Sequence, residues 1–167
     1  MRRLRVWRDR GITLVVIAGI VASVSARSGS HDQVGATPTG AACRVQGSGD
    51  LVRPDDGCTP GAFDRLSRAA VCRHKQRPSL PVTERLRILR EYGVPAWSGR
   101  DGELDHRVPF FLGGKTTEDN LWPERGEIPN EKDRVENEVR RRVCKGSMTV
   151  AQARAVFLGD WTKARGL

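Results

Sequence analysis

The spacing of apolar residues predicts a helix that begins near Thr83 and ends at Gly93. Leu86, Leu89 and Tyr92 recur three residues apart, so they share one face of a helix of about ten residues. Threonine is a typical N-cap residue, and glycine commonly ends a helix. We therefore expect one amphipathic helix in this segment.

Two further helices are predicted toward the C-terminus. The first follows Asn130, which has the sequence context of an N-cap, and carries an apolar stripe of residues spaced by four: Val135, Val139 and Val143. The second begins with the capping box of Thr149 and Gln152 and is expected to continue to Gly166. Both helices should bury one face.

Two extended apolar stretches precede these helices. They are LDHRVPFFL (residues 104–112) and DNLWPE (residues 119–124), and GGKTTE joins them. Apolar runs separated by a glycine-bearing turn predict a β-hairpin. A hairpin with helices before and after it gives an α+β fold class.

Residues 1–26 have the composition of an export signal. Five arginines stand against one aspartate in the first ten residues, and the run GITLVVIAGIVASVSA follows. This run is shorter than the roughly 20 residues that span a bilayer comfortably, and Val24 and Ala26 are the small residues expected before a signal peptidase cut. We expect cleavage near Ala26 and secretion. The alternative is a membrane anchor formed by residues 11–26, with the domain outside.

The remaining chain divides by composition into three parts. Residues 27–41 are small, polar and without periodicity, which is typical of a flexible linker. Residues 42–80 are rich in cysteine, glycine and proline, and we expect disulfides to hold this lead segment. Residues 81–167 then form one domain that includes the C-terminal helix.

The four cysteines are even in number, and none lies in a CxxC pair, which favours disulfides over structural zinc in an exported chain. Three pairings are possible, and the sequence does not choose among them. We favour Cys43 with Cys58 and Cys72 with Cys144. The second bridge would fasten the segment before the core to the end of a core helix.

The formal net charge is +9, and it falls to +5 when residues 1–26 are removed. This basic excess fits a polyanionic partner such as nucleic acid. An arginine-rich solvated surface explains the charge about equally well.

The stretch ELDHRVPFFLGGKTTEDNLWPE, residues 103–124, places an Asp-His pair before a proline, then two glycines, then Asn followed by Leu and Trp. These signals, in this order, resemble HNH endonucleases of the ββα-metal, or His-Me finger, type. The motifs CTPGAFD, LWPE, PNEKDRVE and the VC-x-G ending extend the resemblance to a group of bacterial exported HNH-like proteins. It covers about Cys58 to Trp161 and implies a ββα-metal core with flanking helices.

The resemblance implies a role for each polar residue of the motif. Hydrolysis of a phosphodiester needs an activated water, and histidine titrates near neutral pH, so His106 is the candidate general base. Asp105 and Asn130 would supply oxygen ligands to one divalent cation, although Asn130 as a plain helix cap competes with that role. Asn120 would hold the backbone of the loop around the histidine.

Two further expectations concern the geometry of this site. Neighbours on a regular strand project to opposite faces, so for Asp105 and His106 to serve one site the strand must twist or bulge, and Pro109 is consistent with such a break. Four basic residues are candidates for phosphate contact: Arg107, Lys115, Arg125 and Lys132.

These observations predict an exported, metal-dependent endonuclease that cuts DNA, and RNA as a further substrate, with little sequence preference. The cation would be Mg²⁺ in the first place, with Mn²⁺ or Ca²⁺ as alternatives, and no structural zinc is expected. The rival is a non-catalytic, disulfide-held module that binds nucleic acid or an envelope partner. We expect a monomer. An inhibitor or immunity protein is conceivable, but nothing in the chain identifies one.

Overall fold

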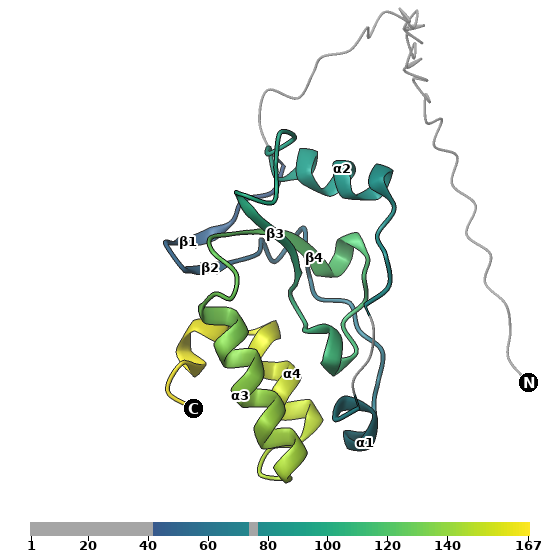
Figure 1. The fold of residues 1–167 in the computed structure, drawn as a ribbon, viewed down its shortest axis with the longest axis vertical. Helices are drawn as coiled ribbons and strands as arrows, with labels where there is room; N and C mark the ends of the chain where they lie inside the picture. The colour runs from purple at the N-terminus through teal and green to yellow at the C-terminus, as the bar shows by residue number, and fades with distance from the viewer. Residues whose placement is uncertain (1–41, 74–76) are drawn as a thin grey trace, which may run out of the picture. The chain divides into compact units, whose positions relative to one another are not determined.

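The computed structural model describes residues 42–73 and 77–167 (Figure 1). The predicted export signal (1–26), the alternative anchor (11–26) and the linker (27–41) lie outside the described residues. The described part is an α+β fold with four helices and two small antiparallel sheets. Within this part, no helix combines the length and the apolar character that a membrane crossing requires.

The elements follow one another along the chain as β1 (Gln46–Ser48), β2 (Leu51–Arg53), α1 (Arg68–Val71), α2 (Val82–Glu91), β3 (Gly102–His106), β4 (Leu121–Arg125), α3 (Glu131–Lys145) and α4 (Val150–Leu158). Short 3-10 helices cover Phe110–Leu112, Glu118–Asn120 and Trp161–Ala164. Strand β1 pairs with β2, and β3 pairs with β4.

The predicted hairpin is present as β3 and β4, but its first strand is shorter than expected. Strand β3 ends at His106, and Phe110–Leu112 form a 3-10 helix with Pro109 at its N-cap. Proline cannot donate to a strand ladder, and its fixed φ angle suits the start of a helical turn. The apolar run therefore bends away from the sheet after the histidine.

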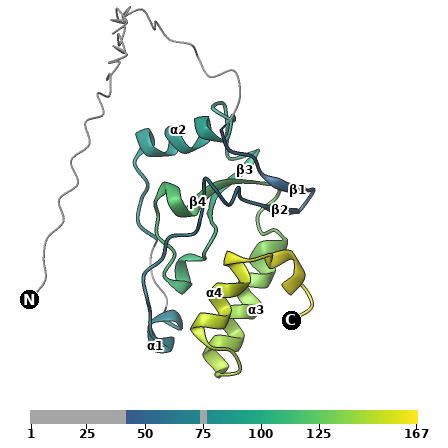
Figure 2. The same ribbon diagram turned by 180° about the vertical axis from the view of Figure 1, so that it is seen from behind.

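Helices α3 and α4 lie against each other (Figures 1 and 2). The predicted N-cap at Asn130 and the predicted capping box at Thr149 are both confirmed, and Asn130 forms a capping box as well, with Asp133. The valine stripe of α3 is buried as predicted. Helix α4 is shorter than predicted, because it ends at Leu158, where Gly159 takes the C-cap.

Helix α2 differs from the prediction at its start and in its buried face. Its N-cap is Pro81, which makes no side-chain hydrogen bond, and Thr83 lies inside the helix. Leu86 is 42 % exposed, whereas Ile88 is buried beside Leu89. Helix α2 packs on β4. The buried face of the helix is the face that contacts this strand, and it differs from the face that the spacing of the leucines predicts.

Two apolar clusters form the interior. One joins α1, α3 and α4 and contains, among others, Val71, Val108, Leu112, Val139, Val143, Phe157 and Trp161. The other lies between α2 and the strands and contains Cys43, Val52, Ile88, Tyr92, Leu121 and Trp122. Because the β3 and β4 hairpin contributes to both clusters, it is fixed from two sides.

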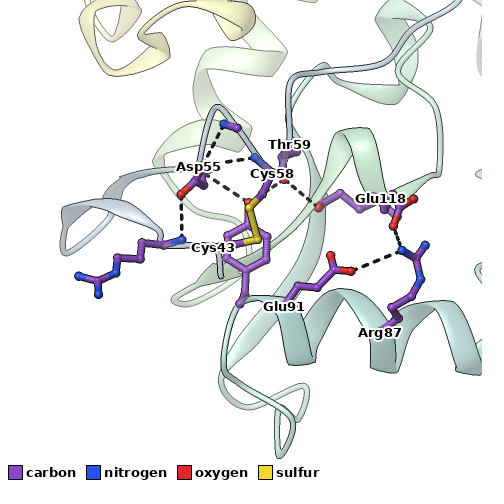
Figure 3. Close-up of a disulfide and its surroundings, with 11 residues drawn as sticks. Cys43, Asp55, Cys58, Thr59, Arg87, Glu91 and Glu118 are labelled. Carbon is purple, nitrogen blue, oxygen red and sulfur yellow. Dashed lines mark hydrogen bonds and ion pairs between the residues drawn. A yellow bond between two sulfur atoms is a disulfide. The ribbon is translucent and has the colours of Figure 1, made fainter. Parts of the chain in front are cut away.

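Both disulfides have the pairing that we favoured from the sequence. Cys43 is bonded to Cys58 (Figure 3), and Cys72 is bonded to Cys144. The second bridge joins the C-cap of α1 to α3. The lead segment also meets the rest of the chain through the Trp161 indole, which donates to the carbonyl oxygen of Val52 at 3.1 Å.

Candidate functional site

The pairing of β3 with β4 is regular through the Asp-His pair. Asp105 lies opposite Trp122 and His106 lies opposite Leu121, with no extra residue in the register. The bulge that we expected here is therefore absent from the strand. Regular geometry sends the two side chains in opposite directions.

Asp105 points toward α3 and forms an ion pair with the ammonium of Lys132. The same ammonium lies 2.5 Å from Oε1 of Glu136, one helical turn further along. Asp105 is 3 % exposed and Lys132 is 1 % exposed. Burial by itself would raise the pKa of Asp105, but the charge of Lys132 and a hydrogen bond from Glu124 outweigh it and hold that pKa below its usual range.

Glu124 completes this buried group from β4. Burial raises the pKa of Glu124 to about 10, and the Asp105 carboxylate nearby adds to the shift, so Glu124 is protonated at neutral pH and donates to Asp105. Its Oε2 atom has no hydrogen-bond partner among the described residues. Burial also raises the pKa of Glu136 to about 7. The Lys132 ammonium thus contacts two carboxyl groups, those of Asp105 and Glu136, and Glu124 lies beside Asp105.

His106 turns away from this group toward the loop that follows the strand. Its Nε2 atom lies 3.0 Å from Oγ1 of Thr116, and its Nδ1 atom has no partner in the described part of the chain. The centre of its ring lies 5.9 Å from that of Phe110. Burial lowers the pKa of His106 to about 4, although Asp105 opposes the shift, so the imidazole is neutral at pH 7.

Asn120 fastens both ends of the loop between the two strands. Its Oδ1 atom accepts from the backbone N–H of Val108 at 2.8 Å, and its Nδ2 atom donates to the carbonyl oxygens of Val108 and Lys115, both at 3.0 Å. Asn120 is fully buried. Gly114 makes this approach possible, since a Cβ atom there would overlap the Val108 carbonyl oxygen.

Asn130 does not join Asp105 and His106. Its side chain accepts from the N–H of Asp133 at 3.0 Å, and its own N–H donates to the Asp133 carboxylate at 2.9 Å, which is a complete capping box. In residues 42–73 and 77–167, no three acidic, histidine or cysteine side chains are placed to hold a metal ion. The Asn130 side chain is therefore engaged in the helix cap, and Asp105 is paired with Lys132.

Two of the four predicted phosphate contacts have other roles. Arg107 is buried, where it donates to the carbonyl oxygens of Thr59 at 2.7 Å and Leu158 at 2.5 Å and pairs with Asp56 at 2.6 Å. Lys132 is enclosed by carboxyl groups, as described above. Neither side chain is open to a polyanion, because Arg107 and Lys132 are both buried.

The other two predicted phosphate contacts are accessible. Lys115 pairs with Asp64 at 3.4 Å and keeps nearly half of its side chain exposed. The Arg125 guanidinium lies 5.0 Å from the ring centre of Trp97. Lys115 lies in the loop between β3 and β4, whereas Arg125 is the last residue of β4. The two residues therefore do not form one site.

The structure adds a cavity that we did not predict as a site. Its volume is about 240 Å³, and its walls are Arg73, Arg77, Phe110, Phe111, Asp133, Glu136, Asn137 and Arg140. It shares Phe110 with the surroundings of His106. The sequence carried one signal for it, the basic cluster CRHKQR, which supplies Arg73 and Arg77.

Comparison of the chain with family models, with curated proteins and with solved structures found no match. The resemblance to HNH endonucleases therefore depends on the motif residues themselves.

Proposed function

We propose that the protein is an exported HNH-type nuclease that hydrolyses phosphodiester bonds of DNA, and of RNA as a further substrate. The observation that carries the proposal is His106, a neutral imidazole with one unpartnered nitrogen, beside an arginine-lined cavity. The order of two paired strands followed by α3 agrees with a ββα core. Asn120 has the loop-holding contacts that the resemblance implies.

The residues support a simple division of labour. Neutral His106 can accept a proton from an attacking water, because its pKa lies below neutral pH. Thr116 orients the ring through Nε2, which leaves Nδ1 for the proton. The guanidinium groups of the neighbouring cavity supply positive charge that attracts the nucleic acid strand to the site. The ion pair between Asp105 and Lys132 would stabilise the site, because it joins β3 to α3.

The cleavage assay described below tests whether the proposed activity requires a divalent cation. The predicted ligands do not fit it as placed, because Asn130 caps α3 and Asp105 is paired with Lys132. The oxygen atoms of Asp105, Glu124 and Glu136 are of the type that Mg²⁺ prefers, but Asp105 and Glu136 are paired with the Lys132 ammonium. No step of the proposed reaction is assigned to a metal.

Export and a nucleic acid substrate have separate support. Two disulfides indicate an oxidising compartment, as expected for a secreted or surface-anchored domain. The basic net charge fits a polyanion. We also propose that the protein cuts with little sequence preference. Reading a base sequence directly requires a helix or β-ribbon that enters a groove of the duplex. The motif residues are assigned to catalysis and to phosphate contact, which carry no sequence information.

A second candidate is the non-catalytic module, and one observation favours it. Asp105 is already neutralised by Lys132, and His106 is only 3 % exposed, so the Asp-His pair could serve the fold alone. In that case the arginine-lined cavity would bind nucleic acid without cleavage.

The test is a cleavage assay with purified protein on plasmid DNA and on RNA, in EDTA and with Mg²⁺, Mn²⁺ or Ca²⁺. The nuclease proposal expects cleavage that falls roughly 10²- to 10⁴-fold in His106→Ala, with nucleic acid affinity retained. Arg134→Gln is the matched control, because Arg134 is an exposed residue of α3 that pairs with Glu131. If the wild-type protein binds nucleic acid but cuts neither substrate under any condition, the non-catalytic module is the correct description.

A further inference from the structure

Within residues 42–73 and 77–167, no ion pair joins the arginines of the cavity next to His106 to a carboxylate. Other arginines of the fold form ion pairs, among them Arg53, Arg87, Arg107, Arg134, Arg141 and Arg142. In contrast, Arg73 donates to the carbonyl oxygen of Ala69, and Arg140 reaches the carbonyl oxygen of Arg73 at 3.5 Å. Contacts to carbonyl oxygens leave the positive charge uncompensated.

The two acidic residues in the cavity wall are committed to other partners. The Asp133 carboxylate accepts from the backbone N–H of Asn130 in the capping box of α3. Glu136 is held by Lys132 at 2.5 Å. The wall therefore contains three arginines, and neither of its two acids forms an ion pair with them among the described residues. The guanidinium groups are available to an anion.

Two aromatic rings shape the same cavity. The Arg140 guanidinium lies 5.7 Å from the ring centre of Phe111. Phe110 lines the cavity, and its ring centre lies 5.9 Å from that of His106. Flat apolar faces beside guanidinium groups suit a nucleotide better than an inorganic anion, because sugar and base surfaces can contact the rings. His106 is not part of the cavity wall, so a phosphate bound here is not the one that the water activated by His106 attacks.

We propose that this cavity binds a phosphate of the substrate strand adjacent to the phosphate that is cleaved. The inference rests on the proposed function, and it specifies the substrate class: a polynucleotide with consecutive phosphates, rather than an isolated phosphodiester. Arg73, Arg77 and Arg140 hold the neighbouring phosphate, and Phe110 and Phe111 contact the nucleoside between the two phosphates. Binding energy from this second phosphate positions the scissile bond at His106.

The experiment compares two substrates with the full chain. One is a single-stranded oligonucleotide, and the other is bis(p-nitrophenyl) phosphate, which carries one phosphodiester and no neighbouring phosphate. Arg77→Gln and Arg140→Gln are each expected to lower kcat/KM for the oligonucleotide about tenfold, as for the loss of one charged contact. Hydrolysis of bis(p-nitrophenyl) phosphate is expected to stay unchanged.

The control is Arg134→Gln, which removes the same charge from the same helix outside the cavity and is expected to change neither substrate. Arg77 is exposed, so its replacement does not endanger folding, and thermal melting verifies this for Arg140→Gln. Equal losses on both substrates, or no loss on the oligonucleotide, would overturn the proposal.

A binding measurement separates this inference from the nuclease proposal. Fluorescence anisotropy of a labelled oligonucleotide is recorded with the His106→Ala chain over a range of salt concentrations. Arg77→Gln added to it is expected to weaken binding and to reduce the slope of log K against log salt by about 0.7. If the wild type cleaves neither substrate, the proposed function fails, and an unchanged slope refutes the phosphate site independently.

Discussion

Lys132 of α3 and Asp105 of β3 form an ion pair that is almost completely removed from solvent. The pair joins the helix to the hairpin, and Glu136 and Glu124 enclose it. Charges taken out of water are stable only while each keeps its partner. This relationship therefore makes the position sensitive to any change that removes one charge alone.

We predict that Lys132→Met lowers the free energy of unfolding by about 3–5 kcal/mol, because it leaves buried carboxyl groups without their cation. Urea denaturation measures the loss. Arg134→Met on the exposed side of α3 is expected to change stability by less than about 1 kcal/mol. The double variant Lys132→Met with Asp105→Asn should recover a large part of the loss. A single variant as stable as the wild type would show that the ion pair does not contribute.

The features of the fold that follow from neighbouring residues were predictable. The capping boxes at Asn130 and Thr149 and the valine stripe of α3 depend on residues three or four apart, so the sequence displays them directly. The inner face of α2 was not predictable in this way. It depends on contact with β4, and Leu86 is left outside although its spacing suits a buried position.

Asn120 supplies a second prediction, because its three hydrogen bonds all go to backbone groups. Asn120→Ala leaves these groups unpaired in the interior, at about 1–3 kcal/mol for each. We expect a stability loss of at least about 3 kcal/mol and a lower cleavage rate as the loop beside His106 loosens. Urea denaturation and the cleavage assay measure the two effects. Asp119→Ala is the control, since Asp119 is exposed and adjacent in the chain; equal effects of both changes would contradict the role of Asn120.

The two disulfides differ in the length of chain that they close. The Cys72 to Cys144 bridge spans 72 residues and the Cys43 to Cys58 bridge spans 15. In the chain-entropy model their removal costs about 4 and about 3 kcal/mol. We therefore expect the double variant Cys72→Ala with Cys144→Ala to be less stable than Cys43→Ala with Cys58→Ala, as measured by denaturation. The reverse order would mean that native contacts, rather than loop closure, determine the difference.

The sequence predicted the part of the candidate site that lies within the hairpin motif. Asp105, His106 and Asn120 lie on the hairpin, where local sequence defines their positions. The partners of Asp105 were not predictable, since Lys132 reaches it from 27 residues away. Lys132 and Arg107 were predicted as candidates for phosphate contact because they are basic and lie near the motif. Their burial depends on carboxyl and carbonyl groups that only the folded chain brings together.

Asp55 provides a test of pH dependence away from the site. Its carboxylate accepts from the backbone N–H of Arg44 at 3.1 Å and of Gly57 at 2.9 Å, beside the Cys43 to Cys58 bridge (Figure 3). The bond from Arg44 is the main reason that the pKa of Asp55 is lowered from its ordinary value of 3.8.

A carboxylate whose pKa is lower in the folded state stabilises the fold above its unfolded pKa, and this contribution disappears as the pH falls through the folded value. We therefore expect Asp55→Asn to melt below the wild type at pH 6 and the difference to vanish as the pH falls below 3.8. Melting temperatures at several pH values between 6 and 2.5 measure this convergence. Asp64→Asn is the control, because that carboxylate is largely exposed, and its melting difference is expected to be small throughout. A constant difference between Asp55→Asn and the wild type would show that the stabilising bonds do not depend on the ionised carboxylate.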